Sequence, residues 1–358
     1  MPKILTIDIG AGTMDILHYD TETKRSYKAV VQSPVMYLAQ KVKKTPGSLI
    51  ITGCEMGGGS FTNEIKKKAE KEKVIMSASA SATVHHSIER VESLGITVVS
   101  DEKAESLLEE GNKTAIISQD LDWNRIKEIV GRFGMDLSFD CIGICAQDHG
   151  RAPNGVSHLD FRQTIFKPLL DKSPFPHTLL YKQDEIPECM NRLRAIEQTA
   201  KNIPAEDVYV MDSGFAAILG ASLDLAARNE ETIVVLDIAT SHTVAATVQQ
   251  RQIAGYFEYH TRDISAEKIE DLIPKLCDGK IEHKEILKQG GHGAYLNKSV
   301  GYKKVKKIIA TGPKRNLLRT ARLPITFGAP FGDNMMTGTV GLLEAIRRSK
   351  GLEKIDYC

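Results

Sequence analysis

The sequence predicts an α/β protein of two domains, each of which opens with a β-hairpin. Two segments, residues 4–17 and 233–248, share one pattern: an apolar strand ending in aspartate, a turn of small residues and a second strand. Strand-like and helix-like patterns alternate along the rest of the chain. Its 358 residues also exceed what a single core usually holds. We expect domains at residues 1–207 and 208–358, with an interdomain helix near 213–222.

The other elements follow from hydrophobic periodicity and from turn residues. Apolar runs predict strands at 49–53, 96–99 and 208–211, and a further strand around Cys141. Apolar residues at helical spacing predict helices at 61–73, 84–94, 123–133, 190–201, 265–276 and 340–348. The proline-rich segment 168–187 and the glycine- and lysine-rich segment 278–304 are expected to be irregular.

Composition excludes some classes of partner. The chain has 47 basic and 46 acidic residues, so long-range attraction to nucleic acid or to an anionic membrane is not expected. No stretch approaches the roughly 20 apolar residues of a membrane span, and the first residues do not resemble a secretory leader. We therefore expect a cytoplasmic protein. Six irregularly spaced cysteines argue against a disulfide framework, and the oligomeric state stays open.

Both hairpin turns carry residues suited to phosphate and metal. Residues 8–13 read DIGAGT and residues 237–241 read DIATS. Backbone N–H groups of such turns can converge on phosphate oxygens, and a carboxylate at the strand end can hold a metal through water. The alternative is that each segment is only a tight β-turn. Two facing turns would grip one triphosphate through Gly10, Gly12, Thr13, Thr240 and Ser241, with Asp8 and Asp237 as metal ligands.

The order and spacing of these segments resemble the actin, Hsp70 and sugar-kinase superfamily. Residues 212–220, DSGFAAILG, are similar to the interdomain helix of sugar kinases, and residues 308–318, IIATGPKRNLL, are similar to their adenosine segment. The resemblance implies two ribonuclease-H-like (actin-like ATPase) domains with a nucleotide cleft between them. It also implies ATP and Mg²⁺ as cofactors, with adenosine contacts at Gly312, Lys314 and Asn316.

The sequence departs from the superfamily pattern at two positions. Ala239 stands where Hsp70-like members use glycine, and Pro313 stands where a second glycine is usual. Proline removes one backbone donor and fixes φ, which leaves open how adenine is held.

The resemblance also implies residues for the acceptor. Asp212 matches the general base of sugar kinases and, with Asp8, is the expected catalytic pair. The alternative is that Asp212 caps the helix that follows it. Residues 142–150, IGICAQDHG, are similar to the sugar-contacting segment of xylulose-type kinases, so Gln147, Asp148 and His149 are expected at the substrate. The alternative there is an Asx-turn formed by Asp148 with a solvated His149.

Three further segments have two readings each. Residues 57–59 are glycines in a P-loop-like position, but Gly59 stands where the phosphate-binding lysine belongs, so they either approach a substrate or form a plain turn. Cys141 and Cys145 supply two of the three cysteines of a radical-SAM cluster motif; they would lie roughly 13 Å apart along a strand, and we expect buried apolar cysteines instead. Asp333 and Asn334 favour capping of the last helix over a metal contact.

Over its whole length the chain is similar to a prokaryotic family in this superfamily whose members carry the label "putative pyruvate formate-lyase activating enzyme". Residues 147–150, 212–217 and 241–243 carry that similarity. Glycyl-radical activation needs three cluster cysteines, and this motif supplies two, so we do not expect that chemistry.

The favoured function is phosphoryl transfer from ATP to a small molecule, with Asp212 as general base. Two alternatives stay open: an ATPase that remodels or reactivates a partner enzyme, and a non-catalytic nucleotide-binding protein.

Overall fold

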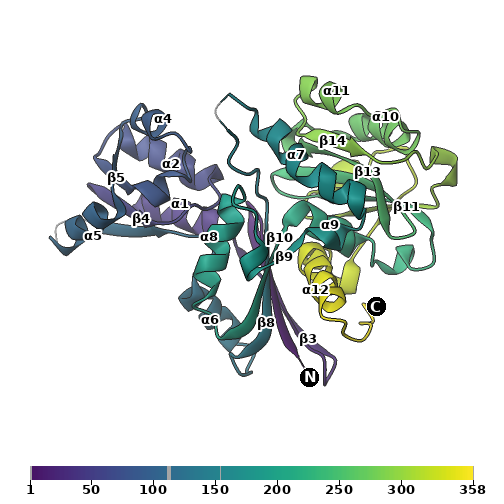
Figure 1. Ribbon diagram of the computed structural model, residues 1–358, viewed down its shortest axis with the longest axis horizontal. Coiled ribbons are helices and arrows are strands. Elements are labelled where there is room, and N and C mark those ends of the chain that lie inside the picture. Colours follow the sequence, from purple (N-terminus) through teal and green to yellow (C-terminus); the bar gives the residue numbers. More distant parts are fainter. Residues whose placement is uncertain (1, 111–113, 154, 358) are drawn as a thin grey trace.

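Two six-stranded sheets built on the same strand pattern form the body of the protein (Figure 1). The computed structural model describes residues 2–110, 114–153 and 155–357. The first sheet has the order β3-β2-β1-β8-β10-β9, with bounds Arg25–Gln32, Thr13–Asp20, Lys3–Ile9, Phe139–Ala146, Ala205–Asp212 and Leu180–Lys182. The second has the order β14-β13-β12-β11-β15-β16, with bounds Gly293–Leu296, Gln252–His260, His242–Gln249, Thr232–Ile238, Lys307–Thr311 and Ile325–Phe327.

The two sheets repeat one connection pattern. In the first, β1, β2 and β3 form an antiparallel meander, and β8 and then β10 add in parallel beside β1. In the second, β11, β12 and β13 form the meander, and β15 and then β16 add in parallel beside β11. The central strands β1 and β11 are buried almost throughout, which explains their continuous apolar sequence. This duplication confirms the predicted fold class of two ribonuclease-H-like halves.

The expected domain boundary at residue 207 falls inside β10. That strand pairs in parallel with β8 up to Asp212, so residues 208–212 belong to the first sheet. The expected interdomain helix is α9, Ser213–Ala221, which follows directly. The crossing from the first half to the second therefore occurs at the helix.

A separate lobe is inserted between β3 and β8 and lies at the left of Figure 1. Its parallel sheet has the order β6-β5-β4-β7, with bounds Ile96–Val99, Val74–Ser77, Leu49–Gly53 and Thr114–Ser118. Its helices are α1 Pro34–Lys44, α2 Gly59–Ala69, α3 Ala78–Ser81, α4 Ile88–Glu92 and α5 Asp101–Glu109. The lobe has its own apolar core, which includes Ile51, Phe61 and Met76.

The remaining helices cover the two main sheets. They are α6 Trp123–Gly131, α7 His158–Lys172, α8 Asn191–Ala200, α10 Ala266–Cys277, α11 His283–Lys288 and α12 Thr337–Ser349. Short 3-10 helices lie at Pro176–Leu179, Gln183–Glu185, Leu225–Ala227, Thr261–Asp263, Tyr302–Lys304, Arg315–Leu318, Pro330–Gly332 and Asn334–Met336. No helix in the described ranges combines the length and the apolar character that crossing a membrane requires.

Three sequence expectations differ from the structure. The helix expected at 84–94 is only the five residues of α4, which begins at its Ser87 cap. The segment 278–304, expected to be irregular, contains α11 and β14, because pairing of β14 with β13 orders it. The connector 168–187 likewise contains the end of α7 and the short strand β9.

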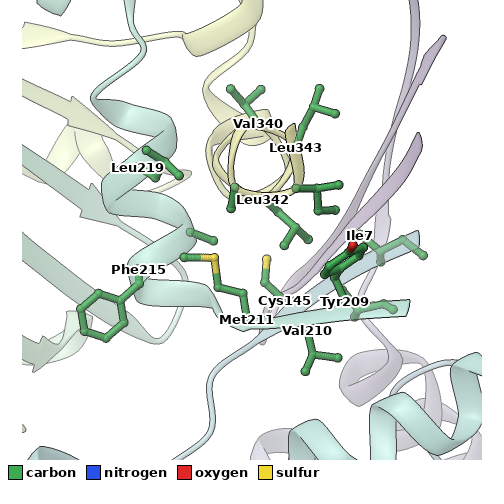
Figure 2. Packing of buried hydrophobic residues seen from close by; sticks show 14 of the residues in the cluster. Ile7, Cys145, Tyr209, Val210, Met211, Phe215, Leu219, Val340, Leu342 and Leu343 are labelled. Atoms are coloured by element: carbon green, nitrogen blue, oxygen red, sulfur yellow. The ribbon is translucent and has the colours of Figure 1, made fainter. Parts of the chain in front are cut away.

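Helices α9 and α12 pack against each other between the two sheets. Each helix has a glycine at the crossing, where a Cβ atom would overlap a backbone carbonyl of the other helix: Gly220 faces Thr337, and Gly341 faces Ala216. Figure 2 shows the buried residues around this crossing, with Phe215 and Leu219 on α9 and Val340, Leu342 and Leu343 on α12. The two backbones therefore touch directly.

We predict that Gly341→Ala destabilises the protein by about 3 kcal/mol, since the added methyl group must push the two helices apart. Urea unfolding measures this loss. Gly131→Ala is the matched control, because Gly131 is also helical but has nothing within 4 Å of an added Cβ atom. The control is expected to be as stable as the wild type or slightly more stable. Equal effects of the two substitutions would contradict this account.

A buried histidine in β2 makes stability depend on pH. His18 is 1 % exposed, neither ring nitrogen has a hydrogen-bond partner in the described structure, and its ring lies about 6 Å from that of Phe139. Burial lowers the pKa of His18 to about 4. In the unfolded state His18 is protonated below about pH 6.5, whereas in the folded state it is protonated only below about pH 4. The free energy of unfolding therefore falls as the pH falls from about 6.5 to about 4.

We predict that His18→Phe removes part of this acid sensitivity. Between pH 7 and pH 5 the wild type should lose about 1 to 2 kcal/mol more stability than the variant. Urea unfolding at the two pH values measures the difference. Identical losses in both proteins would show that His18 is not the group that titrates.

Candidate functional site

The turns of the two hairpins meet between the two halves of the protein. Each is closed by the same hydrogen bond: the Gly10 N–H donates to the Thr13 carbonyl, and the Ala239 N–H donates to the His242 carbonyl, both at 3.0 Å. A Cβ atom on Gly12 would lie 2.8 Å from the Thr240 Oγ1, so the turns are in contact and only glycine fits there.

A cavity of about 420 Å³ opens beside these turns. The structure brings to its wall nine of the residues predicted from the sequence, namely Asp8, Gly10, Thr13, Gln147, His149, Asp237, Thr240, Ser241 and Gly312. Five other predicted residues do not line it: Gly12, Asp148, Asp212, Lys314 and Asn316.

Carboxylates from both hairpins gather at this cavity. Burial, together with the charge of Asp237, raises the pKa of Asp8 to about 7. Burial raises the pKa of Asp237 to about 6, and burial together with Asp8 raises the pKa of Asp15 to about 8. One oxygen of Asp15 has no hydrogen-bond partner within the described chain. Crowded, buried carboxylate oxygens suit a hard divalent cation such as Mg²⁺, whose charge would offset their repulsion.

Gly312 closes the second hairpin's side of the cavity. Its φ is +86°, and a Cβ atom would lie 2.5 Å from the Ile238 carbonyl oxygen, so glycine is required on both counts. The chain then turns outward at Pro313, which lines the cavity, and Lys314 and Asn316 are exposed outside it. Of the segment predicted to contact adenosine, the turn at Gly312 and Pro313 therefore lines the cavity, whereas the side chains of Lys314 and Asn316 do not.

Asp212 is enclosed and fully paired. Its carboxylate is 0 % exposed and forms a two-point ion pair with Arg162, with both N···O distances 2.9 Å. It also accepts hydrogen bonds from the N–H groups of Gly214 at 3.0 Å and Asp148 at 3.3 Å. This geometry is that of the helix cap, the alternative to the general base.

Of the three residues expected at the substrate after β8, two line the cavity and one forms a turn. Asp148 accepts hydrogen bonds from the Gly150 and Leu193 N–H groups at 2.8 and 3.0 Å, so it forms the Asx-turn named as the alternative. Gln147 lies at the cavity and donates to the Glu258 carboxylate. His149 also lines the cavity and is mostly buried rather than solvated; burial, helped by Arg162, lowers its pKa well below its usual value.

The glycines at 57–59 also reach the cavity. Gly57 and Gly58 precede α2 and Gly59 is its first residue, and the helix has no side-chain cap. Beside them, Arg192 lines the cavity and is held by Asp120 at 2.7 and 2.9 Å, while the same Asp120 accepts from the Gly57 N–H. Asp120 balances the charge of Arg192, so the N–H groups at the start of α2 are what suits an anion at this end of the cavity.

Three histidines, His149, His242 and His260, line the cavity together with Glu258, and His292 packs behind them. The rings of His242, His260 and His292 pack with centroids 4.3 to 4.7 Å apart, and His149 approaches two of them at 5.6 and 5.8 Å. Burial lowers the pKa of His242 to about 3. Although burial alone would raise the pKa of Glu258, Arg162 at 3.2 Å and the nearby imidazoles hold it well below its usual range.

The cysteines do not form a metal cluster among the described residues. Cys141 and Cys145 are both buried on β8, in agreement with the apolar interpretation. Burial raises the pKa of both thiols, which disfavours the thiolate form that binds iron. Asp333 caps the 3-10 helix Asn334–Met336 by accepting from the Met335 N–H at 2.9 Å, and Asn334 lines the cavity.

Sequence reasoning missed several residues of this cavity. Two of them, Arg192 and Glu258, line the cavity, and Arg162 is buried against Glu258. All three are single charged residues in ordinary helices and strands, with no motif around them. Gly338 of α12 lies so close to Asp8 that a Cβ atom would overlap the carboxylate. The one available signal was His242, which directly follows the second phosphate turn in the sequence.

Comparison with known proteins places the chain in a family. The family model described as "Putative pyruvate format-lyase activating enzyme (DUF1786)" matches residues 56–317, and the chain belongs to this family. No curated protein matches the sequence.

Several solved structures are similar to it. They include "a putative 2-dehydro-3-deoxygalactonokinase protein from Sinorhizobium meliloti" (8% identity, TM-score 0.37, covering 98% of this chain and 100% of that one). MreB5 of Spiroplasma citri bound to ADP has 12% identity and a TM-score of 0.35, covering 98% and 97%. Lmo2764, "a putative N-acetylmannosamine kinase" from Listeria monocytogenes, has 8% identity and a TM-score of 0.34, covering 97% and 99%. The fold itself is established by the repeated strand order of the two sheets.

We predict that Asp212→Asn destabilises the protein by about 3 kcal/mol or more, because it removes one of the two carboxylates that pair with the buried Arg162 guanidinium and leaves only Glu258. Thermal and urea unfolding measure this loss. Asp207→Asn on the same strand is the control: its ion pairs with Lys182 and Lys350 lie near the surface, so about 1 kcal/mol or less is expected. A stable Asp212→Asn protein that has lost only its turnover would instead support the general base.

Proposed function

We propose that this family member binds ATP with Mg²⁺ in the cavity between its two halves and transfers the γ-phosphoryl group to a small acceptor. The observation that carries the proposal is the meeting of the two hairpin turns beside Asp8 and Asp237, two carboxylates whose pKa values are raised mainly by burial. Such a pair of turns offers backbone donors to phosphate oxygens from two sides.

Different residues of the cavity would hold the metal ion, the phosphates and the nucleoside. Asp8 and Asp237 would hold Mg²⁺ through its water ligands, and the bound ion would offset phosphate charge. The turns at Gly10–Thr13 and at Thr240 and Ser241 would hold the phosphates. Gly312 and Pro313 lie where the second hairpin borders the cavity and would face the nucleoside.

The acceptor would lie toward Arg192 and the first turn of α2. In the proposed reaction the bond between the γ-phosphorus and its bridging oxygen breaks, a bond to the acceptor oxygen forms, and the acceptor's proton leaves to a base or to water. Phosphoryl transfer needs mainly positioning and charge stabilisation. It therefore does not require Asp212, whose lone pairs are already occupied. The N–H groups at the start of α2 favour an acceptor that carries a carboxylate or phosphate.

One observation favours the ATPase alternative. The enclosure of Asp212 leaves the cavity without the base that the sequence predicted. Water could then replace the acceptor, and the protein would couple hydrolysis to a partner enzyme.

We predict that Asp8→Asn weakens Mg-ATP binding at least about tenfold while leaving the nucleotide-free protein as stable as the wild type or more so. The substitution removes a repelling charge from beside Asp237 and also removes a metal contact. Titration calorimetry and thermal shift at millimolar Mg-ATP measure the two effects. The exposed Asp184→Asn is the control and should bind like the wild type.

No stabilisation of the wild type by Mg-ATP would overturn the proposal. With binding established, the fate of the phosphoryl group separates the two functions. Incubation with labelled ATP and a pool of acidic metabolites should yield a phosphorylated small molecule. Phosphate release that is stimulated only by added protein would favour the ATPase alternative.

A further inference from the structure

Three histidines from distant parts of the chain converge at one point of the cavity. His149 follows β8 in the first half, His242 begins β12, and His292 precedes β14 in the second half. One ring nitrogen from each of the three lies within 4.8 Å of the other two. His149 and His242 line the cavity, and His292 lies behind them with 4 % exposure.

Each of these histidines has a buried nitrogen that lacks a hydrogen-bond partner in the described structure. The three atoms are Nδ1 of His149, Nε2 of His242 and Nδ1 of His292. A buried polar atom without a partner costs about 1 to 3 kcal/mol. Three such atoms, on three histidines from separate segments that converge, indicate that a ligand normally satisfies them.

A hydrogen bond at Nδ1 of His242 fixes the orientation of its ring. His242 Nδ1 shares a hydrogen bond of 2.8 Å with the Ser241 hydroxyl, which leaves Nε2 for the ligand. A partner on the second nitrogen is what orients histidines that bind metals.

We propose that these three nitrogens bind one divalent transition-metal ion of the zinc type. Imidazole nitrogen suits zinc and its neighbours in the transition series, whereas Mg²⁺ prefers oxygen. In a tetrahedral zinc site with bonds of about 2.0 to 2.1 Å, ligand nitrogens lie about 3.3 Å apart. The converging nitrogens, which lie within 4.8 Å of one another, would reach this spacing by rotation of the side chains. With three protein ligands, a fourth position stays open toward the cavity.

The surroundings favour a cation at this point. The Glu258 carboxylate lies 3.7 Å from Nδ1 of His292 and is itself held by Gln147 and by Arg162. It brings a negative charge next to the three rings without forming a hydrogen bond to the free nitrogens. The ring of His260 packs against His242 and His292, but its nitrogens are not among the converging atoms.

This site is distinct from the carboxylate site of the proposed Mg-ATP and does not depend on nucleotide binding. Its ligands come from both halves of the protein, so a bound ion would join them at the wall of the cavity. Its open position would take a metal-coordinating oxygen or nitrogen of a small molecule in the cavity.

The test is a zinc titration of chelator-treated protein without nucleotide or magnesium, against a competing indicator chelator. The wild type should bind one zinc ion per chain. His149→Ala, His242→Ala and His292→Ala should each weaken binding at least about 100-fold. Without zinc, the free energy of unfolding of each variant should equal or exceed that of the wild type, since each substitution removes an unpaired buried nitrogen. His260→Ala is the matched control and should keep the full stoichiometry.

X-ray absorption on the wild-type zinc complex gives a second measurement that needs no variant. The expected spectrum shows imidazole scattering with nitrogen at about 2.0 Å. Sulfur scattering would overturn the proposal. So would stoichiometric binding that survives in the three alanine variants, or no binding stronger than that of the His242→Ala protein.

Discussion

Backbone contact between α9 and α12 sets the distance between the two halves, and the cavity depends on that distance. The contact exists because Gly220 and Gly341 leave no Cβ atoms at the crossing. The same helix α12 carries Gly338, one turn earlier, against the Asp8 carboxylate. A single stripe of glycines thus packs the helix pair and leaves room for the acid of the first phosphate turn. Any residue that widened the crossing would also move Asp8 relative to Asp237.

A second constraint is the buried charge of Arg162 on α7. It pairs with Asp212 at the end of the first sheet and with Glu258 in the second. One guanidinium therefore bridges both halves from a position 2 % exposed. Because removing either carboxylate would leave the buried guanidinium with one partner instead of two, the relative position of the two halves is defined by electrostatics as well as by helix packing.

The sequence predicted what is local and missed what the tertiary fold assembles. Both hairpins, with Asp8 and Asp237 at their strand ends, follow from strand patterns and turn residues within about 15 positions. The pairing of Asp212 with Arg162 joins residues 50 positions apart, so the motif match could not reveal that its carboxylate is occupied. His292 reaches His242 only because β14 pairs with β13, in a segment whose composition favoured a loop. Lys314 and Asn316 matched a family pattern, but the chain leaves the cavity at Pro313 before it reaches them.

The cavity holds two donor sets of different chemical hardness. Oxygen donors at Asp8 and Asp237 lie beside the phosphate turns, and nitrogen donors at His149 and His242 lie on another part of the wall. Hard cations prefer the first set and borderline transition metals prefer the second, so the protein could keep two different ions apart without competition. Arg162 and Glu258 stand behind the nitrogen set, and their ion pair ties it to the helix cap at Asp212. Asp212, expected from the sequence to be a base, thus caps α9 and pairs with Arg162, which also holds Glu258 at the cavity wall.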